Sequence, residues 1–334
     1  MRKYPVLTIT LILIAIILVS LTLGRYPMTL AEIYHSAADS IAGRELTYKQ
    51  SEIIFLITEI RLPRIIAAVL VGSALAVSGA AYQAMFVNPL VSPGILGVLA
   101  GASFGAAVGI VIIESWIATQ IMAFVFACAA VGLAVLLSLL LPRSTLLVLI
   151  LGGMISGSLF TSLSSLLKYI ADPTSQLPEL VYWLMGTLAN ATNTVLIHVG
   201  FIMVAGIVFL CFQGKLLNVL SLGDEEAQAL GISVKRKRIE IIAAATLVSA
   251  STVVIAGTIG WVGLVVPHMA RFFVGPDNRV LMPVTAIGGG AFMLLTDSVV
   301  RSAFTMEIPI GIVTSLVSLP LVVFAMYQNK GRWR

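Results

Sequence analysis

Residues 63–87 read PRIIAAVLVGSALAVSGAAYQAMFV, and Arg64 is the only charged residue among them. A helix needs about 20 mostly apolar residues to cross the hydrocarbon layer of a bilayer. Gly72 and Gly79 interrupt the run, but spanning helices tolerate glycine where they are packed against other protein segments. The stretch therefore predicts a transmembrane helix.

Similar runs recur along the whole chain. Its 334 residues are 59% hydrophobic and 10% charged, with a mean hydropathy of +1.06, whereas a soluble domain is about 45–50% apolar and about 25% charged. We therefore predict an all-α membrane protein, a single transmembrane domain over 1–334. About ten spans are expected, at roughly 6–24, 63–87, 94–113, 115–141, 145–168, 194–213, 238–256, 259–272, 280–302 and 309–327.

The first run follows Met1-Arg2-Lys3 and resembles a signal peptide. It is too long for the apolar core of such a peptide and lacks a small-residue cleavage site, so we predict an uncleaved span. With the N-terminus inside, Lys and Arg concentrate in the inner loops, as the positive-inside rule requires. This bias explains the net charge of +5 without nucleic acid.

Both termini are then cytoplasmic. Two polar external segments, about 25–60 and 169–193, are expected to form short surface helices, and one substantial cytoplasmic loop covers about 214–237. Four residues of the first half recur at the same spacing in the second, five spans later. Either these common residue types coincide by chance, or the two halves are repeats of opposite topology, a transporter feature. The two sets are Ser73, Gly79, Pro89 and Gly97, and Ser251, Gly257, Pro267 and Gly275.

The cytoplasmic loop contains LSLGDEEAQALG at 220–231. We expect Ser221 to cap a short helix with acidic residues in its first turn, where the helix dipole favours them. Gly231 is suited to end that helix, and Ala227 and Leu230 would form a small apolar face. Two interpretations stay open here: a solvated loop helix, or a docking element for a partner.

Six motifs in order, between about 61 and 320, resemble the permease family that serves iron–siderophore, haem and cobalamin importers of the ATP-binding-cassette (ABC) superfamily. Trp261 and Val87 depart from the family pattern. The motifs are Arg61-Leu-Pro-Arg64, Gly72-x2-Leu75-x3-Gly79-x3-Gln83, Asn88-Pro-Leu90-x2-Pro93, Leu220-x-Leu-Gly-Asp-Glu-x-Ala227-x2-Leu-Gly231, Gly260-x2-Gly263-Leu264-x2-Pro267-His268-x2-Arg271 and Glu307-x-Pro-x-Gly311.

The resemblance implies a cobalamin-importer-permease-like fold with inverted-repeat halves, in the cytoplasmic (inner) membrane of a bacterium or archaeon. It implies a homodimer with the pathway at its axis, two cytoplasmic ATPase subunits and an extracytoplasmic solute-binding protein. ATPase coupling would fall to Leu220, Gly223, Asp224, Glu225, Ala227, Leu230 and Gly231, binding-protein docking to Arg61, Arg64 and Arg301, and an inner gate to Asn88, Leu90, Ser144 and Thr145.

Each of these assignments has a plainer alternative. Arginines at the ends of spans often extend their charge to the interface without binding a partner. The two prolines of 88–93 break a helix and also suit a simple turn. Asp297 lies four residues before Arg301, so the two can pair on one helix face; an intramembrane carboxylate is otherwise a candidate for proton coupling.

No ATPase is expected within the chain, because Gly214-Lys215 lacks the upstream glycine and the following Ser or Thr of a phosphate-binding loop. We expect no catalytic residue, metal site or cofactor. The function predicted is an importer permease for a metal chelate, with ferric siderophore or haem first and cobalamin or molybdate open. An ion-coupled secondary transporter is the alternative; a membrane-embedded enzyme would need a reactive cluster that the spans lack.

Overall fold

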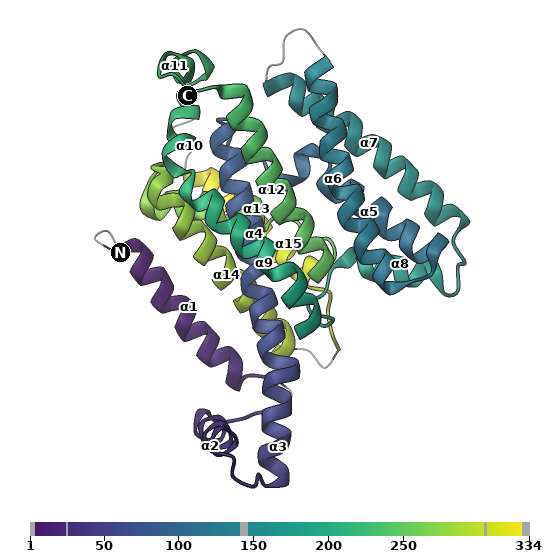
Figure 1. The fold of residues 1–334 in the computed structure, drawn as a ribbon, viewed down its shortest axis with the longest axis vertical. Helices are drawn as coiled ribbons and strands as arrows, with labels where there is room; N and C mark the ends of the chain where they lie inside the picture. The colour runs from purple at the N-terminus through teal and green to yellow at the C-terminus, as the bar shows by residue number, and fades with distance from the viewer. Residues whose placement is uncertain (1–3, 25, 141–145, 304–305, 329–334) are drawn as a thin grey trace.

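The computed structural model describes residues 4–24, 26–140, 146–303 and 306–328, without the side chains at 324–326 and 328. All regular secondary structure in these ranges is helical (Figure 1). The helices are α1 (Pro5–Thr22), α2 (Leu30–Ile41), α3 (Tyr48–Phe55), α4 (Leu62–Met85), α5 (Val98–Ala107), α6 (Trp116–Leu140), α7 (Leu146–Ile170), α8 (Gln176–Met185), α9 (Asn193–Phe212), α10 (Gly214–Leu220), α11 (Asp224–Ala229), α12 (Val234–Ala256), α13 (Val262–Val274), α14 (Asn278–Ala303) and α15 (Ile310–Gln328).

Three short helical segments complete the order. Leu56–Arg61 joins α3 to α4 as π-helix, so that the chain is helical from Tyr48 to Met85. A 3₁₀ turn, Pro93–Leu96, precedes α5, and a second π-helical segment, Val108–Ile113, extends it.

The predicted spans all fall on helices. Seven helical segments in the described ranges are long and apolar enough to cross a membrane, and 98–113, 262–274 and 310–323 are apolar but shorter. All ten predicted spans therefore lie on helical segments, and seven of these segments are long and apolar enough to cross a membrane. The eighth predicted span, 259–272, corresponds to the 13-residue helix α13.

The external segments also form the expected helices. Thr29 and Thr47 begin α2 and α3 with capping boxes. Each threonine side chain accepts a hydrogen bond from the backbone N–H three residues later, at Glu32 or Gln50, and the side chain of that residue accepts one from the threonine N–H. Helix α8 occupies the second segment, but its Leu180 and Trp183 are buried rather than lying on the surface.

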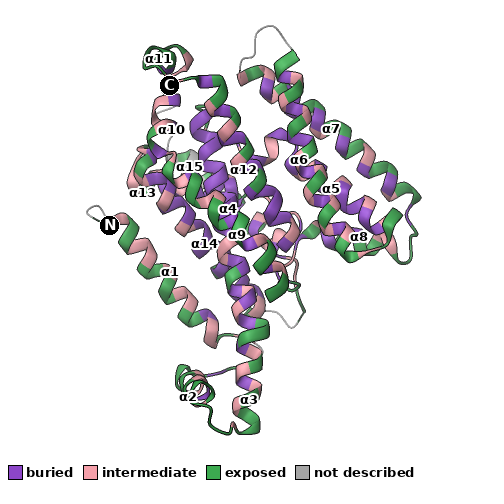
Figure 2. Ribbon diagram, in the orientation of Figure 1, coloured by how far each residue is buried: buried purple, intermediate pink, exposed green. Residues whose placement is uncertain are grey.

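Helix α4 is the centre of the bundle and packs against α12, α13 and α14 (Figure 2). Two of its glycines allow this contact. A Cβ at Gly72 would lie 2.1 Å from the carbonyl oxygen of Gly289, and one at Gly79 would lie 1.7 Å from that of Gly263. Small residues let helix backbones approach where lipid gives no hydrophobic driving force.

Helices α5, α6 and α7 form a second group beside this centre (Figure 1). Phe104, Phe126 and Phe160, one from each helix, have ring centroids 4.8–6.1 Å apart. Helix α1 is different, since Ser20 is its only buried residue and most of its surface is left for lipid.

The residues that recur between the halves do not occupy equivalent places. Gly79 lies inside α4, whereas Gly257 ends α12 with a φ of +67°. Pro89 lies between helices, whereas Pro267 lies inside α13. Their common spacing therefore does not by itself equate the helices of the two halves.

Candidate functional site

Helix α11 lies at the opposite end of the molecule from α2 and α3 (Figure 1). Following the predicted topology, we call the α11 end inner and the α2–α3 end outer. The loop predicted over 214–237 is mostly helical, because α10 and α11 occupy it and α12 already begins at Val234.

The end of α11 follows the sequence prediction. Gly231 has a φ of +80°. Its N–H donates to Gln228 O at 2.8 Å, and the N–H of Ile232 donates to Ala227 O at 3.1 Å. This pair of bonds is a Schellman motif, which satisfies the last carbonyls of the helix. Six residues are thus held as a defined helix with a fixed end.

The start of α11 differs from the prediction. Ser221 does not cap it; Gly223 precedes the first helical residue, with a φ of +124°. Helix α10 continues to Leu220, so Ser221 ends that helix instead. Its hydroxyl is close to two carbonyl oxygens, Leu217 O at 2.7 Å and Ala84 O at 3.1 Å. Ser221 therefore connects α10 to the last turn of α4.

The predicted apolar face of α11 is also divided. Ala227 is fully buried, whereas Leu230 is 63% exposed. Three-residue spacing would place both on one face only within a continuous helix, and α11 ends at Ala229. Leu222 and Leu230, on either side of the helix, are exposed together with Glu225 and Glu226. The surface that α11 offers is thus acidic and flanked by two leucines.

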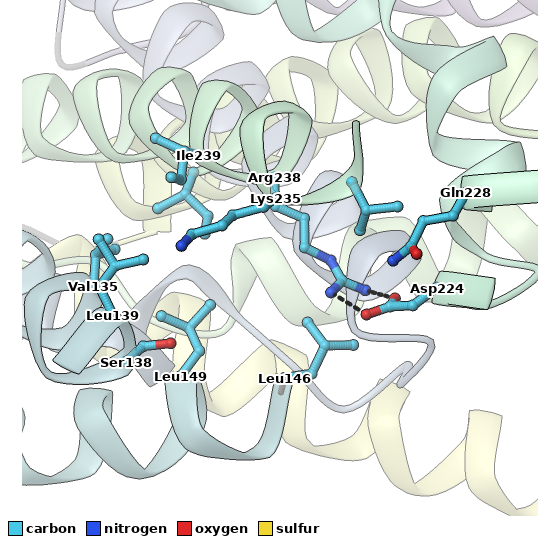
Figure 3. Close-up of a pocket in the computed structure, with 12 residues that line it drawn as sticks. Val135, Ser138, Leu139, Leu146, Leu149, Asp224, Gln228, Lys235, Arg238 and Ile239 are labelled. Atoms are coloured by element: carbon cyan, nitrogen blue, oxygen red, sulfur yellow. Dashed lines mark hydrogen bonds and ion pairs between the residues drawn. The ribbon is translucent and has the colours of Figure 1, made fainter. Parts of the chain in front are cut away.

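Asp224 is held by Arg238 of α12, an interaction that sequence analysis missed. Arg238 Nη1 donates to Asp224 Oδ2 at 2.8 Å, and Nη2 pairs with Oδ1, in a bidentate contact (Figure 3). The arginine side chain is 11% exposed and the aspartate 43%. We call this contact the inner clamp.

A hollow of about 150 Å³ lies beside the inner clamp. Figure 3 shows the side chains of Leu139 and Leu146, which end α6 and begin α7, across it from Arg238. The predicted gate residues Ser144 and Thr145 lie outside the described residues. The hollow is therefore lined by the residues that flank the segment holding those two.

Coupling-loop residues also contact α14. Asn218 of α10 donates to Asp277 Oδ1 at 2.7 Å and accepts from the N–H of Asn278 at 2.8 Å. Hydrogen bonds from Arg279 and then Asn218 hold the pKa of Asp277 well below its usual range. This carboxylate remains charged at neutral pH and fixes α10 against the start of α14.

The other two predicted gate residues form a turn after α4. Asn88 Oδ1 accepts from the N–H of Leu90 at 2.9 Å, and Asn88 O accepts from the N–H of Val91 at 3.3 Å. Leu90 is 49% exposed. The preceding Val87 has a φ of +50°, a conformation that costs a β-branched residue about 1–3 kcal/mol.

Trp261, the other departure from the family pattern, shares this conformation, with a φ of +68° just before α13. Both departures from the motifs therefore stand at left-handed backbone positions. Nothing in the structure explains why tryptophan is used at 261.

At the outer end, Asp297 pairs with two arginines. Arg301 Nε lies 2.9 Å from Asp297 Oδ2, which confirms the predicted pair. Arg64 Nη2 lies 2.9 Å from Asp297 Oδ1, and Arg64 Nη1 lies 2.9 Å from Glu307 Oε1. Arg301 also donates to Ser20 of α1. We call Arg64, Asp297, Arg301 and Glu307 the outer cluster.

Arg61, the third predicted docking arginine, points elsewhere. It is 5% exposed, and its guanidinium donates to the backbone carbonyls of Leu21 and Tyr26. Arg64 and Arg301 are also mostly buried. The three arginines thus all have acceptors within the chain, and Glu307 is the most exposed member of the outer cluster.

Comparison with known proteins places the chain in a family. A profile of the FecCD transport family matches residues 12–328. The chain belongs to this family. It is 38% identical to the molybdate import system permease protein MolB of Haemophilus influenzae over 96% of this chain and 95% of that protein. It is 32% identical to the cobalamin import system permease protein BtuC of Halobacterium salinarum over 96% and 95%.

A solved structure agrees. An inward-facing metal-chelate type ABC transporter matches with a TM-score of 0.87 and 36% identity, over 97% of this chain and 98% of that one. The predicted fold class and the family resemblance are therefore confirmed.

Proposed function

We propose that two copies of this chain form the gated membrane pathway of a binding-protein-dependent ABC importer, in the cytoplasmic membrane, with ATP hydrolysed by a separate partner chain. The observation that carries the proposal is the inner surface around α11. It combines a fixed helix with exposed Glu225 and Glu226 and two outward leucines, Leu222 and Leu230. The two leucines can bury in a contact with another subunit, while the acidic side chains stay at its polar rim.

The experiment is transport in proteoliposomes that contain this chain and its partner ATPase. Uptake of cargo from the loaded binding protein should require ATP and continue without an ion gradient. The coupling residues Leu220, Gly223, Asp224, Glu225, Ala227, Leu230 and Gly231 would act together, with the buried ones holding the exposed ones in place. Uptake driven by an ion gradient alone would contradict the proposal.

The alternative function, ion-coupled transport, receives little support from the surroundings of Asp297. It needs an intramembrane carboxylate free to take up a proton or cation. Asp297, the candidate for that role, is fully buried between Arg64 and Arg301. Both carboxylate oxygens of Asp297 are thus already paired with arginines of the same chain.

For cargo we propose a metal chelate, with ferric siderophore or haem first. The relatives named for molybdate and cobalamin import define the rest of the panel. The same proteoliposomes, each supplied with one loaded binding protein, separate the four candidates. Uptake of molybdate alone would mean that the cargo is a small oxyanion and not a bulky chelate.

We also propose the outer cluster as the place where a carboxylate of the binding protein docks, with Arg64 as the receiving group and Arg301 and Arg61 beside it. Arginine suits this task because its planar fork pairs with carboxylates. In the free chain Glu307 occupies one side of Arg64 at 2.9 Å. An incoming carboxylate would take over that position.

Two variants test the docking proposal. Arg64→Glu should abolish capture of the loaded binding protein, but it also removes a partner of Asp297 and can disturb the fold. Glu307→Gln removes only the internal carboxylate and should tighten capture about twofold to fivefold, the range of one exposed ion pair. Unchanged affinity of Glu307→Gln in a pull-down would count against docking on Arg64.

A further inference from the structure

Residues 218–224, from α10 to the first residue of α11, contact three spans through their side chains. Ser221 contacts the end of α4, Asn218 contacts the start of α14, and Asp224 contacts Arg238 of α12. The inner clamp is the one of these three contacts that starts from α11 itself. Displacement of α11 by a partner is therefore transmitted to α12 through Arg238 in addition to the four connecting residues 230–233.

We propose that Arg238 is the positioning residue that transmits movement of α11 to α12, so that the inner clamp couples ATP hydrolysis to opening of the pathway. This inference rests on the proposed function and adds a residue outside the predicted coupling set. Arg238 is mostly buried in the protein, so its role is to hold Asp224 rather than to contact the ATPase.

The geometry suits transmission of force. The guanidinium bonds both oxygens of Asp224, and a bidentate pair resists rotation as well as separation. Ala227, one turn further along α11, is fully buried. Helix α11 is thus fastened to the bundle at its first turn and packed at its centre, and cannot swing independently of α12.

The hollow beside the clamp gives α12 room to move. Its far wall is formed by Ser138 and Leu139 at the end of α6 and by Leu146 and Leu149 at the start of α7 (Figure 3). Closing the hollow would bring α12 against the two helix ends that flank 141–145.

Ser221 supplies a second and weaker route. Its hydroxyl contacts Ala84 O at 3.1 Å, four residues before Asn88 of the predicted gate. A single neutral hydrogen bond is weaker and less directional than a bidentate ion pair. We therefore expect Ser221→Ala to alter coupling less than a change at Arg238.

The test uses the complete transporter with Arg238→Gln. Assembly with the ATPase and its hydrolysis of ATP should persist, while cargo moved per ATP hydrolysed should fall about tenfold, as for loss of a hydrogen bond between charged groups. Arg236→Gln is the matched control. It removes the same charge two residues earlier, from a side chain that is 80% exposed and paired with Glu240, and should leave the ratio unchanged.

A reversed pair separates positioning from folding. Arg238→Asp combined with Asp224→Arg restores an ion pair of opposite polarity and should recover most of the coupling ratio relative to Arg238→Asp alone. An assembled Arg238→Gln transporter with an unchanged ratio would overturn the inference. So would a reversed pair that assembles and hydrolyses ATP but does not regain coupling. Failure of the proposed function looks different, because the unaltered transporter would then show no ATP-dependent uptake.

Discussion

The two ends of α4 are held in different ways. At its outer end Arg64 shares the buried Asp297 with Arg301, so that charges from α4 and α14 are locked together. At its inner end Gln83 accepts a hydrogen bond from Arg271 of α13 and the Ser221 hydroxyl contacts Ala84 O, and the chain then enters the Asn88–Leu90 turn. The outer end of α4 thus carries a paired charge of its own, whereas its inner end is held by hydrogen bonds to uncharged groups of α4, next to the turn where the gate is proposed.

Removing the negative charge at the centre of the outer cluster should have the largest effect on stability. Asp297→Asn leaves Arg64 and Arg301 mostly buried without their shared counter-charge, and should lower the free energy of unfolding by about 3–5 kcal/mol. Unfolding of the purified protein in mixed micelles measures it. Glu307→Gln is the control, since its 41% exposed carboxylate should contribute at most about 1 kcal/mol. A larger loss for Glu307→Gln would reverse the ranking.

The middle of α4 comes next. Gly79→Ala places a Cβ where Gly263 O lies 1.7 Å away, so α4 and α13 must separate. We expect a loss of about 2–3 kcal/mol by the same unfolding assay. Gly132→Ala in α6 meets nothing within 4 Å and should instead stabilise by about 0.5–1 kcal/mol. Equal effects of the two alanines would show that the helix contact is loose.

At the inner end, Leu90→Ala should change function more than stability. The side chain is about half exposed, so little burial is lost, but a proposed gate residue is shortened. Leak of cargo from liposomes without ATP should rise. Phe201→Ala, which shortens an exposed side chain on α9, should not leak. Tight closure of the Leu90→Ala protein would remove Leu90 from the gate.

The smallest effect is expected at the far outer tip, where Lys49 at the start of the continuous 48–85 helix pairs with Glu32 of α2 at 2.6 Å. Lys49, with Thr29, lowers the pKa of Glu32 from 4.5 to about 2. Because the folded pKa is the lower one, the contact contributes fully above pH 4.5 and is lost as pH falls toward 2.

Amide hydrogen exchange in α2, followed over that pH range, measures the loss. The Lys49 and Glu32 side chains are 62% and 36% exposed, so the change should be confined to α2 and α3. Glu32→Gln should show no such pH dependence. Faster amide exchange that extends into α4 would mean that the contact between α2 and α3 also stabilises the outer cluster.

The sequence could predict those structural features that depend on a local pattern of residues. Apolar runs placed the spans, since crossing a bilayer depends on consecutive residues. Four-residue spacing gave the Asp297–Arg301 pair, and Gly231 gave the end of α11. Each of these relations is contained within one helix or turn.

Contacts between distant segments were missed for the same reason. Arg64 and Asp297 are 233 residues apart, and Asp224 and Arg238 belong to different helices; neither pairing has a local pattern. Ser221 was misassigned because its sequence suits a helix start, while the continuation of α10 made it a helix end. The three arginines do lie at the end of the bundle that carries α2 and α3, but their internal acceptors depend on how α1, α4 and α14 pack.

Arg61 gives this packing a place in biosynthesis. Its guanidinium binds backbone carbonyls of Leu21 and Tyr26, the first of them 40 residues earlier in the chain. At about 5–20 residues per second, the ribosome makes the end of α1 some 2–8 s before it makes the arginine that binds there. Until then α1, apolar on nearly every side, can contact only segments made earlier, such as α2; Arg61 then ties the end of α1 to the start of α4.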